Sequence, residues 1–245
     1  MESELNVSLV IACYNEEGHL RESISQIQKV MAATRYSYEI IFVDDASRDT
    51  TRSIIAQLCA NKSGMRYIFH EKNLGRGSAV MDGIRQAQGA IVGFIDIDLE
   101  THARYIPWVV AEIEEGSDVA CAWRIYKTRL DSLDRWIYNR GYNFLVRTYL
   151  GLEFRDTETG CKFFRREKIL PVLDEVVDRH WFWDTEIIAR AHLKGLKIAE
   201  VPTLYVRRHD KKSTVKVFSD VFYYFKKLVW FKREIEKLKQ GNRGK

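Results

Sequence analysis

Two aspartates, Asp96 and Asp98, stand directly after a short apolar run at residues 91–95. The run predicts a buried strand of a parallel sheet, and α/β proteins bind their ligands at the carboxyl ends of such strands. A hard divalent cation that also binds phosphate oxygens would neutralise two carboxylates at this position. The pair therefore indicates a metal-held phosphate compound, although a turn with two solvated carboxylates gives the same short motif.

Polar residues also follow two other predicted strands. Tyr14 and Glu16 come after the apolar run at residues 7–12, and Asp45 comes after the run at 39–43. Carboxylates and a tyrosine at adjacent strand ends supply acceptors and a flat face for a base and a ribose. The alternative is ordinary helix capping, which Glu16 also suits and which is the favoured interpretation of Asp49.

A glycine-rich segment, residues 73–79, precedes a predicted helix. It lacks the third glycine of a dinucleotide-binding fingerprint, because Val80 stands there, and it follows the third predicted strand instead of the first. A Rossmann dehydrogenase is therefore disfavoured. The segment still indicates a close approach of backbone to a ligand.

These residues need a scaffold, and the sequence predicts one of alternating strands and helices. Four predicted strands, at residues 7–12, 39–43, 66–70 and 91–95, are short and apolar, as strands covered on both faces are. The first helix is expected to open near Glu16. Beyond Leu99 the regularity weakens, with helices expected at residues 108–115, 135–150 and 185–194 and a strand at 118–123.

Composition narrows the class of protein. A chain of 245 residues is long enough for one large α/β domain. The four cysteines are far apart and form no Cys-x-x-Cys, so neither a zinc site nor a disulfide framework is predicted, which is typical of a cytosolic protein. We see no secretory segment and no run of about 18 apolar residues, and expect the protein to be neither secreted nor membrane-spanning.

Charge is unevenly distributed along the chain. Residues 207–245 contain 13 of the 39 Lys and Arg residues but 4 of the 34 Asp and Glu residues. Within this segment, residues 217–238 carry a broad apolar stripe that is rich in phenylalanine and bordered by lysines. The pattern predicts an amphipathic helix with an anionic partner, and it suits a nucleic-acid surface, a packed helix or a membrane interface.

Taken in order, the segments at residues 14–16, 43–49, 73–77 and 96–99 resemble the motifs of the family 2 inverting glycosyltransferases, which have a GT-A fold. The segments at residues 123–126, 140–145, 156–162 and 200–202 are similar to those of the polyprenyl-phosphate or dolichyl-phosphate hexosyltransferases, the mannosyl and glucosyl synthases. The resemblance covers about residues 6–216. It implies a GT-A domain at 1–216, with a mostly parallel sheet and helices on both faces, followed by a membrane-interfacial helix and tail at 217–245.

The function that this resemblance implies is metal-dependent, inverting transfer of a hexose from GDP-mannose or UDP-glucose to a polyprenyl phosphate. It would occur at the cytoplasmic face of a membrane, with the protein peripherally attached and with no nucleic-acid partner. Asp96 and Asp98 would hold Mg²⁺ or Mn²⁺, and Asp156 and Lys162 would serve the acceptor. The residues implied to contact the nucleotide sugar are Tyr14, Glu16, Val43, Asp45, Asp96, Ile97, Arg124, Arg208 and Lys216.

The resemblance implies catalytic roles for Asp98, Arg208, Asp184 and Glu186. The last two are candidate general bases, or caps of the helix that follows them. A phosphate acceptor makes a base optional, since a phosphomonoester with a second pKa of about 6 is already ionised at neutral pH. The family has a lysine where this chain has Thr214, and Lys216 is the favoured substitute over Lys212.

Two other functions stay open at this point. A family 2 enzyme with a hydroxyl acceptor on a glycan, glycolipid or small molecule would require Asp184 or Glu186 as a base. A non-catalytic protein that binds nucleotide sugars or anionic lipids is a different class, and the intact acidic motifs argue against it. The family's usual proline is replaced by Ala12 before the segment at 14–16, which should alter only the rigidity of that loop.

Overall fold

The computed structural model describes residues 6–60, 62–126, 133–208 and 217–241 of the chain. Its contacts divide the chain into two compact units, residues 1–127 with 157–206, and residues 128–156 with 207–245. This division groups residues 128–156 with the C-terminal segment. The domains predicted from the sequence, 1–216 and 217–245, placed residues 128–156 in the first domain. Within the described residues, no helix is both long and apolar enough to cross a lipid bilayer.

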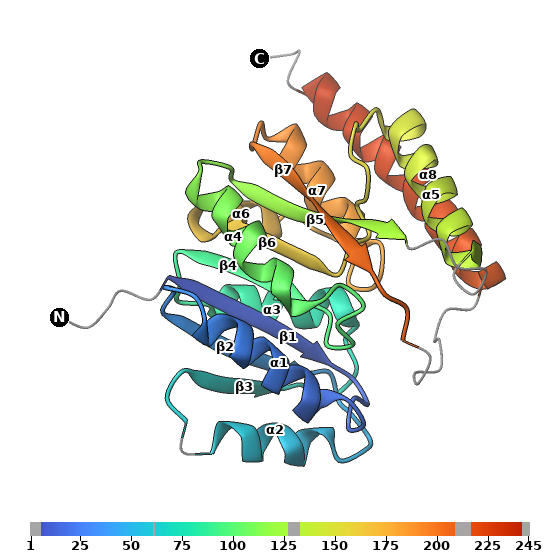
Figure 1. Ribbon diagram of the computed structural model, residues 1–245. Helices are drawn as coiled ribbons and strands as arrows, with labels where there is room; N and C mark the ends of the chain where they lie inside the picture. The colour runs from blue at the N-terminus through green and yellow to red at the C-terminus, as the bar shows by residue number, and fades with distance from the viewer. Residues whose placement is uncertain (1–5, 61, 127–132, 209–216, 242–245) are drawn as a thin grey trace. The chain divides into compact units, whose positions relative to one another are not determined.

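The first unit is built on a seven-stranded sheet with the order β3-β2-β1-β4-β6-β5-β7 (Figure 1). Neighbours β1–β2, β2–β3, β1–β4 and β5–β7 pair in parallel, whereas β6 runs antiparallel to both β4 and β5. The α/β fold with a mostly parallel sheet is therefore confirmed. The strands are β1 Val7–Cys13, β2 Tyr38–Asp44, β3 Met65–Phe69, β4 Ile91–Ile95, β5 Val119–Tyr126, β6 Cys161–Arg165 and β7 Ile198–Tyr205.

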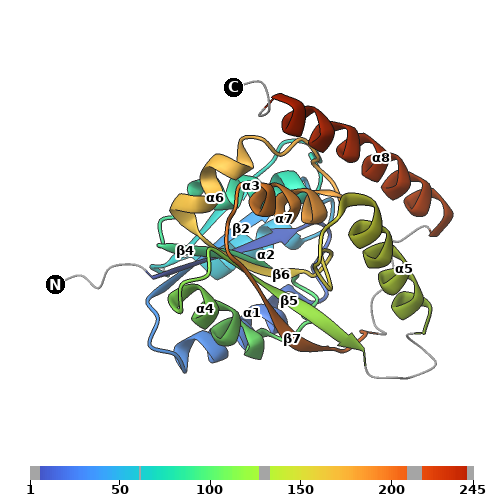
Figure 2. The same ribbon diagram turned by 90° about the horizontal axis from the view of Figure 1, so that it is seen from above.

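Helices cover both faces of this sheet (Figure 2). On one face, apolar side chains of α1 and α4 share one buried cluster with alternate residues of β1, because successive strand residues point to opposite faces. On the other face lie α3, α6 and α7, where Trp183 of α7 meets Phe94 of β4 with ring centroids 5.4 Å apart. The helices of this unit are α1 Leu20–Ala32, α2 Thr51–Cys59, α3 Arg76–Gln86, η1 Ala103–Tyr105, α4 Ile106–Glu114, α6 Arg166–Leu173 and α7 Trp183–Leu193.

The second unit contains α5 Leu133–Leu150 and α8 Val217–Gly241, which pack against each other. The ring centroids of Tyr142 on α5 and Tyr224 on α8 are 4.8 Å apart. At the far end of the pair, Lys232 Nζ donates to the carbonyl oxygen of Tyr149 at 2.9 Å. The C-terminal helix thus forms as the stripe at residues 217–238 predicted.

One sequence expectation needs correction, and one strand was not predicted. The helix expected to open near Glu16 begins at Leu20, because Asn15 has a positive φ of 56° and the backbone turns before the helix starts. Strand β6 was not predicted, since Lys162 interrupts its short apolar run. This strand separates β4 from β5 and brings Gly160 and Lys162 next to the end of β4.

Candidate functional site

Three loops at the carboxyl ends of adjacent parallel strands each contain a non-glycine residue with a positive φ. Among the described residues, the non-glycine residues with positive φ are Asn15 at 56°, Ala46 at 62° and Leu99 at 53°. They lie in the loops after β1, β2 and β4. Such conformations are unfavourable for residues with a Cβ and concentrate at functional sites. The strand order also reverses between β1 and β4, which is where open α/β sheets bind ligands.

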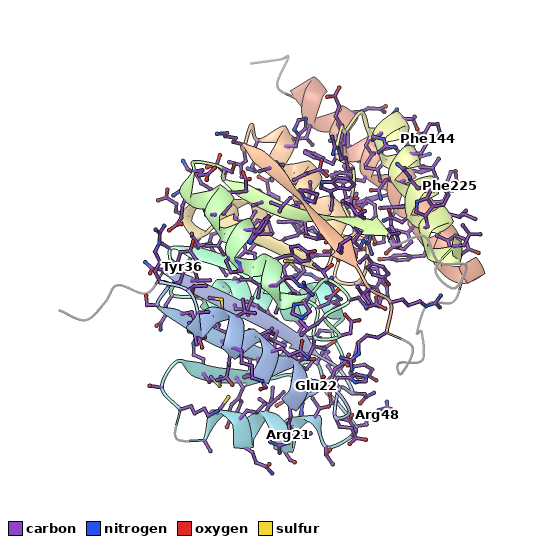
Figure 3. The ribbon with its side chains drawn as sticks, in the orientation of Figure 1. Arg21, Glu22, Tyr36, Arg48, Phe144 and Phe225 are labelled. Atoms are coloured by element: carbon purple, nitrogen blue, oxygen red, sulfur yellow. The ribbon has the colours of Figure 1, made fainter. Side chains whose placement is uncertain are left out.

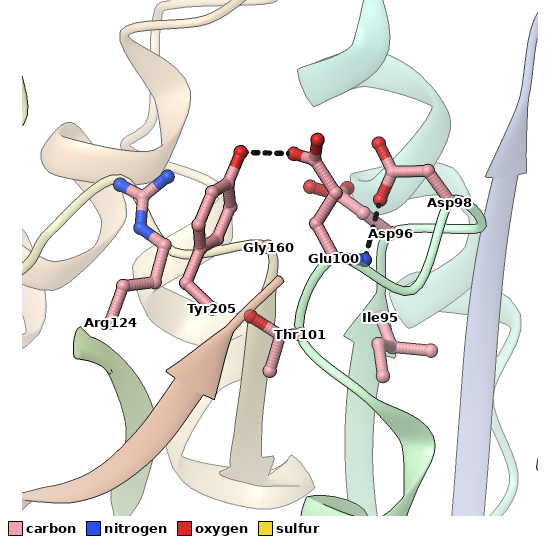
Figure 4. Close-up of a pocket in the computed structure, with 8 residues that line it drawn as sticks. All are labelled: Ile95, Asp96, Asp98, Glu100, Thr101, Arg124, Gly160 and Tyr205. Atoms are coloured by element: carbon pink, nitrogen blue, oxygen red, sulfur yellow. Dashed lines mark hydrogen bonds between the residues drawn. The ribbon is translucent and has the colours of Figure 1, made fainter. Parts of the chain in front are cut away.

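The acidic residues after β4 line a small cavity of about 30 Å³ (Figure 4). This volume has room for an ion with a water. Asp98 Oδ1 accepts from the backbone N–H of Glu100 at 3.2 Å, and Glu100 Oε2 accepts from the Tyr205 hydroxyl at 2.5 Å. The cavity is lined by Ile95, Asp96, Asp98, Glu100, Thr101, Arg124, Gly160 and Tyr205.

Three hydrogen bonds, one to Gly160 and two from Arg76, hold Asp96. Its backbone N–H donates to Gly160 O at 2.7 Å, and its Oδ1 accepts from Arg76 Nε at 3.1 Å and Nη2 at 2.6 Å. A Cβ on Gly160 would lie 1.8 Å from Asp96 Oδ2, so the glycine leaves the space that this carboxylate fills. Desolvation, together with the Asp98 and Asp184 carboxylates, raises the pKa of Asp96 against the lowering effect of Arg76.

Behind Asp96 lies a chain of alternating charges. Arg76 Nη1 donates to Asp184 Oδ2 at 2.5 Å, and Lys162 Nζ donates to Asp184 Oδ1 at 2.6 Å. Lys162 is fully buried, and its Nζ also donates to the carbonyl oxygen of Thr159. The neighbouring carboxylates raise the pKa of Arg76 against its desolvation, so its guanidinium stays charged. The structure therefore brings three predicted residues, Asp96, Asp184 and Lys162, into one network.

Glu186 lies in the first turn of α7 and is fully buried. Its carboxylate accepts hydrogen bonds from the backbone of the preceding loop. Its Oε1 accepts from the N–H of Val177 at 3.1 Å and from Arg190 Nε at 2.7 Å. Its Oε2 accepts from the N–H of Asp178 at 2.8 Å. Both oxygens thus fix the segment that enters α7.

A larger cavity, of about 400 Å³, lies at the carboxyl ends of β1 and β2. Its volume falls within the range of small-molecule sites. Of the residues predicted to contact the nucleoside, Tyr14 lines it and is 43% exposed. The full lining is Tyr14, Ala46, Ser47, Arg48, Arg52, Glu71, Lys72 and Asn73.

Four other residues that the resemblance implies for the nucleotide sugar are buried. Val43 and Ile97 are buried in the protein, and so is Glu16. Asp45 is also buried, with Oδ1 accepting from the N–H of Leu74 at 2.7 Å and Oδ2 from that of Gly75 at 2.8 Å. The Asp45 carboxylate thus holds the loop that precedes α3.

Three predicted residues belong to the second unit. Asp156 is buried, and its Oδ1 accepts from Asn139 Nδ2 at 3.2 Å. Arg208 is half-buried, and Lys216 lies outside the described residues. Their predicted roles remain predictions.

The acidic edge suits a metal that substrate oxygens help to hold. No cluster of three or more His, Cys, Asp or Glu side chains that could bind a metal occurs within residues 6–60, 62–126, 133–208 and 217–241. Mg²⁺ commonly takes one or two carboxylates and completes its shell with waters and substrate phosphates. Asp96 and Asp98, on an ion-sized cavity with Arg124, fit this pattern.

Arg76 and Gly160 entered the sequence predictions only as members of the segments at 73–77 and 156–162, and Glu100 and Tyr205 were not predicted. For Arg76 a signal existed: it is the first residue of α3, where a positive charge opposes the helix dipole and calls for anionic partners. Glu100 and Tyr205 meet across 105 positions, and no local pattern predicts such a pair.

The chain matches the model of the family described as "Glycosyl transferase family 2" over residues 8–170. Glycosyltransferase AglD of Haloferax volcanii is 32% identical over 215 residues, which cover 85% of this chain and 34% of that protein. The undecaprenyl-phosphate 4-deoxy-4-formamido-L-arabinose transferase of Shewanella sediminis is 32% identical over 169 residues, or 69% of this chain and 50% of that one. The chain thus spans about a third to a half of these two relatives.

Solved structures share the fold. Glucosyl-3-phosphoglycerate synthase from Mycobacterium tuberculosis, in complex with Mn²⁺, UDP and glucosyl-3-phosphoglycerate, matches with a TM-score of 0.64 and 23% identity. That match covers 92% of this chain and 77% of the synthase. The same synthase in complex with Mg²⁺ and UDP gives a TM-score of 0.61 and 23% identity over 85% of this chain and 73% of the synthase.

Proposed function

Because the chain belongs to glycosyl transferase family 2, we propose that it transfers a hexose from GDP-mannose or UDP-glucose to the phosphate of a polyprenyl or dolichyl phosphate, with inversion at the anomeric carbon. The observation that carries the proposal is the Asp96 and Asp98 pair on an ion-sized cavity at the end of β4. A nucleoside-sized cavity opens at the ends of β1 and β2 of the same sheet.

On the donor side, Asp96 and Asp98 would hold Mg²⁺ or Mn²⁺ beside the diphosphate of the donor. The metal, when bound, neutralises the negative charge that develops on the leaving nucleoside diphosphate. Arg124 adds a positive charge at the same cavity, and Tyr14 offers its ring to the nucleoside. Structural neighbours that bind Mn²⁺ or Mg²⁺ with UDP support this arrangement.

On the acceptor side, relatives named as undecaprenyl-phosphate transferases support a lipid phosphate. An ionised phosphate attacks the anomeric carbon without losing a proton in the step, so the reaction needs no general base. The engagement of both Glu186 oxygens by backbone and Arg190 agrees with this chemistry.

A matched pair of acceptors tests the proposal. We expect transfer from GDP-[¹⁴C]mannose or UDP-[¹⁴C]glucose to a short polyprenyl phosphate with Mn²⁺, and none to the polyprenol of the same length or in the presence of EDTA. Radioactivity in the organic phase is the measurement. Transfer to the alcohol, or to a polar hydroxyl compound, with the lipid phosphate inert would replace this acceptor with a hydroxyl acceptor.

We also propose that α5 and α8 attach the protein to the cytoplasmic face of a membrane. Seven large apolar or aromatic residues on α5 are exposed by between 38% and 58%, and Phe225 on α8 is 54% exposed. Phe144 on α5 and Phe225 on α8 are labelled in Figure 3. Basic residues on the same helices suit anionic headgroups. The exposed residues of α5 are Leu133, Trp136, Ile137, Tyr138, Phe144, Leu145 and Tyr149.

A double substitution on α5 tests this attachment. Ile137→Ser with Phe144→Ser should lower partition onto vesicles containing phosphatidylglycerol by at least about tenfold, because each apolar side chain transferred from water is worth about 1.5–3 kcal/mol. Vesicle co-sedimentation measures the change. Trp108→Ser on α4 is the matched control, since Trp108 is 67% exposed outside this helix pair. Equal binding by the double variant and the wild type would exclude this face of α5 from the membrane contact.

A further inference from the structure

We propose that Arg76, Asp184 and Lys162 form a positioning network that fixes the Asp96 carboxylate, and that Asp184 is a positioning residue and not a general base. The inference rests on the proposed role of Asp96 in holding the metal and the diphosphate. It goes further by giving Asp184 and Lys162 a function on the donor side of the reaction.

Arg76 links the two carboxylates. Its guanidinium places Nε and Nη2 on Asp96 and Nη1 on Asp184, using three of its five N–H donors in a fixed fork. The guanidinium carbon also lies 5.2 Å from the ring centroid of Phe94 and 5.9 Å from that of Trp181. Two rings and two carboxylates therefore determine where this charge sits, and it in turn determines the position of Asp96 Oδ1.

Asp184 is fully engaged in holding cations. Oδ2 accepts from Arg76 and Oδ1 from Lys162, and 4% of the Asp184 side chain is exposed. A general base must reach the proton that it removes. A buried carboxylate with a cation on each oxygen is placed to anchor Arg76 instead. Lys162, with 0% of its side chain exposed, anchors Asp184 in turn.

The network is balanced and open at one end. Two cations alternate with two carboxylates, and Asp96 is the exposed end, with 44% of its side chain accessible. A divalent ion on a nucleoside diphosphate leaves a net negative charge, so Arg76 behind Asp96 favours binding of that complex. Arg76 is the first residue of α3, where a positive charge interacts unfavourably with the helix dipole. The carboxylates of Asp96 and Asp184 offset this unfavourable interaction.

Two sets of variants test the network. Asp184→Asn alone leaves buried Lys162 without a counter-charge and should lower both thermal stability and turnover strongly. Asp184→Asn with Lys162→Met removes both charges but keeps an amide oxygen that accepts from Arg76. We expect this double variant to regain the melting temperature and to turn over donor within about tenfold of the wild type. A general base predicts a deficit of about 10²–10⁴-fold that Lys162→Met does not relieve.

The second set is read without turnover. Arg76→Gln should raise the Kd of the nucleoside diphosphate, UDP or GDP, by at least about tenfold in the presence of Mn²⁺, measured by calorimetry. Arg85→Gln is the matched control, because Arg85 lies on the same helix and pairs with surface carboxylates Asp82 and Asp174.

Wild-type affinity in Arg76→Gln, or a double variant as inactive as Asp184→Asn, would overturn the network. Both readouts are independent of the acceptor, because donor hydrolysis and nucleotide binding proceed without it. Failure of the lipid phosphate as acceptor therefore leaves these results intact. Absence of Mn²⁺-dependent nucleotide binding in the wild type would overturn the proposed function together with this inference.

Discussion

Replacement of Asp98 by asparagine is expected to lower metal-dependent kcat/KM for the donor by about 10²–10³-fold or more. Asparagine keeps the size of the side chain and removes the charge that a hard cation requires. Asp98 faces the small cavity after β4, where the metal and the diphosphate are proposed to bind. Steady-state release of nucleoside diphosphate across a Mn²⁺ titration measures the loss.

The control for this substitution is Asp174→Asn. The Asp174 side chain is 76% exposed, and its ion pair with Arg85, at 3.6 Å, lies at the surface. We expect its turnover and its Mn²⁺ dependence to equal those of the wild type. Normal metal-dependent turnover in Asp98→Asn would contradict the assignment of Asp98 to the metal.

Substitution of Gly160 by alanine is expected to lower donor turnover by about 10²-fold without unfolding the protein. A loss of this size is typical when a group near the reaction is misplaced by about 1 Å. The new Cβ would stand 1.8 Å from Oδ2 and 2.3 Å from Cγ of Asp96, so this carboxylate must leave its position. Asp96 can move because it lies at the cavity surface. Circular dichroism and donor kinetics together separate loss of activity from loss of fold.

Gly141→Ala is the control, because nothing lies within 4 Å of a Cβ at this position in α5. It should stabilise the helix by about 0.5–1 kcal/mol. A double-mutant cycle then identifies the route of the Gly160 effect. If alanine acts by displacing Asp96, Gly160→Ala adds little to Asp96→Ala. Full additivity of the two losses would show that Gly160 acts elsewhere.

The four strands predicted in the first half of the chain, β1 to β4, are the ones whose local sequence pattern agrees with their place in the sheet. The runs at β1, β2 and β4 are mostly apolar because helices cover both faces, and the polar residues that line the cavities begin where each strand ends. This change of polarity located Asp96 and Asp98. It also identified Tyr14, which lines the larger cavity in the structure.

Strand β6 was not predicted because it contains Lys162, whose partner in the structure is Asp184. A lysine at the second of five positions is unlike a buried strand, yet Lys162 is fully buried because Asp184, 22 positions later, neutralises it. The partner is remote in sequence, so the pattern of residues 161–165 contains no sign of it. The same remoteness hid the partner of Arg76, which meets Asp184 across 108 positions.

Side-chain direction was the other unpredictable quantity. Asp45 and Glu186 are carboxylates at the expected positions, but each turns inward to accept from backbone N–H groups. Which way such a side chain points depends on whether a neighbouring loop offers unpaired donors, and the loops before α3 and α7 do so. Spacing in the sequence identifies the acidic residue, and the fold decides whether it faces ligand or backbone.

The most direct test of the proposed function is mass spectrometry of the lipid fraction after incubation with donor, Mn²⁺ and a short polyprenyl phosphate. We expect a polyprenyl phosphate heavier by one hexose residue, formed with one equivalent of nucleoside diphosphate by the wild type and not by Asp98→Asn. Release of nucleoside diphosphate with the lipid unchanged, or a hexosyl lipid formed equally by Asp98→Asn, would contradict it.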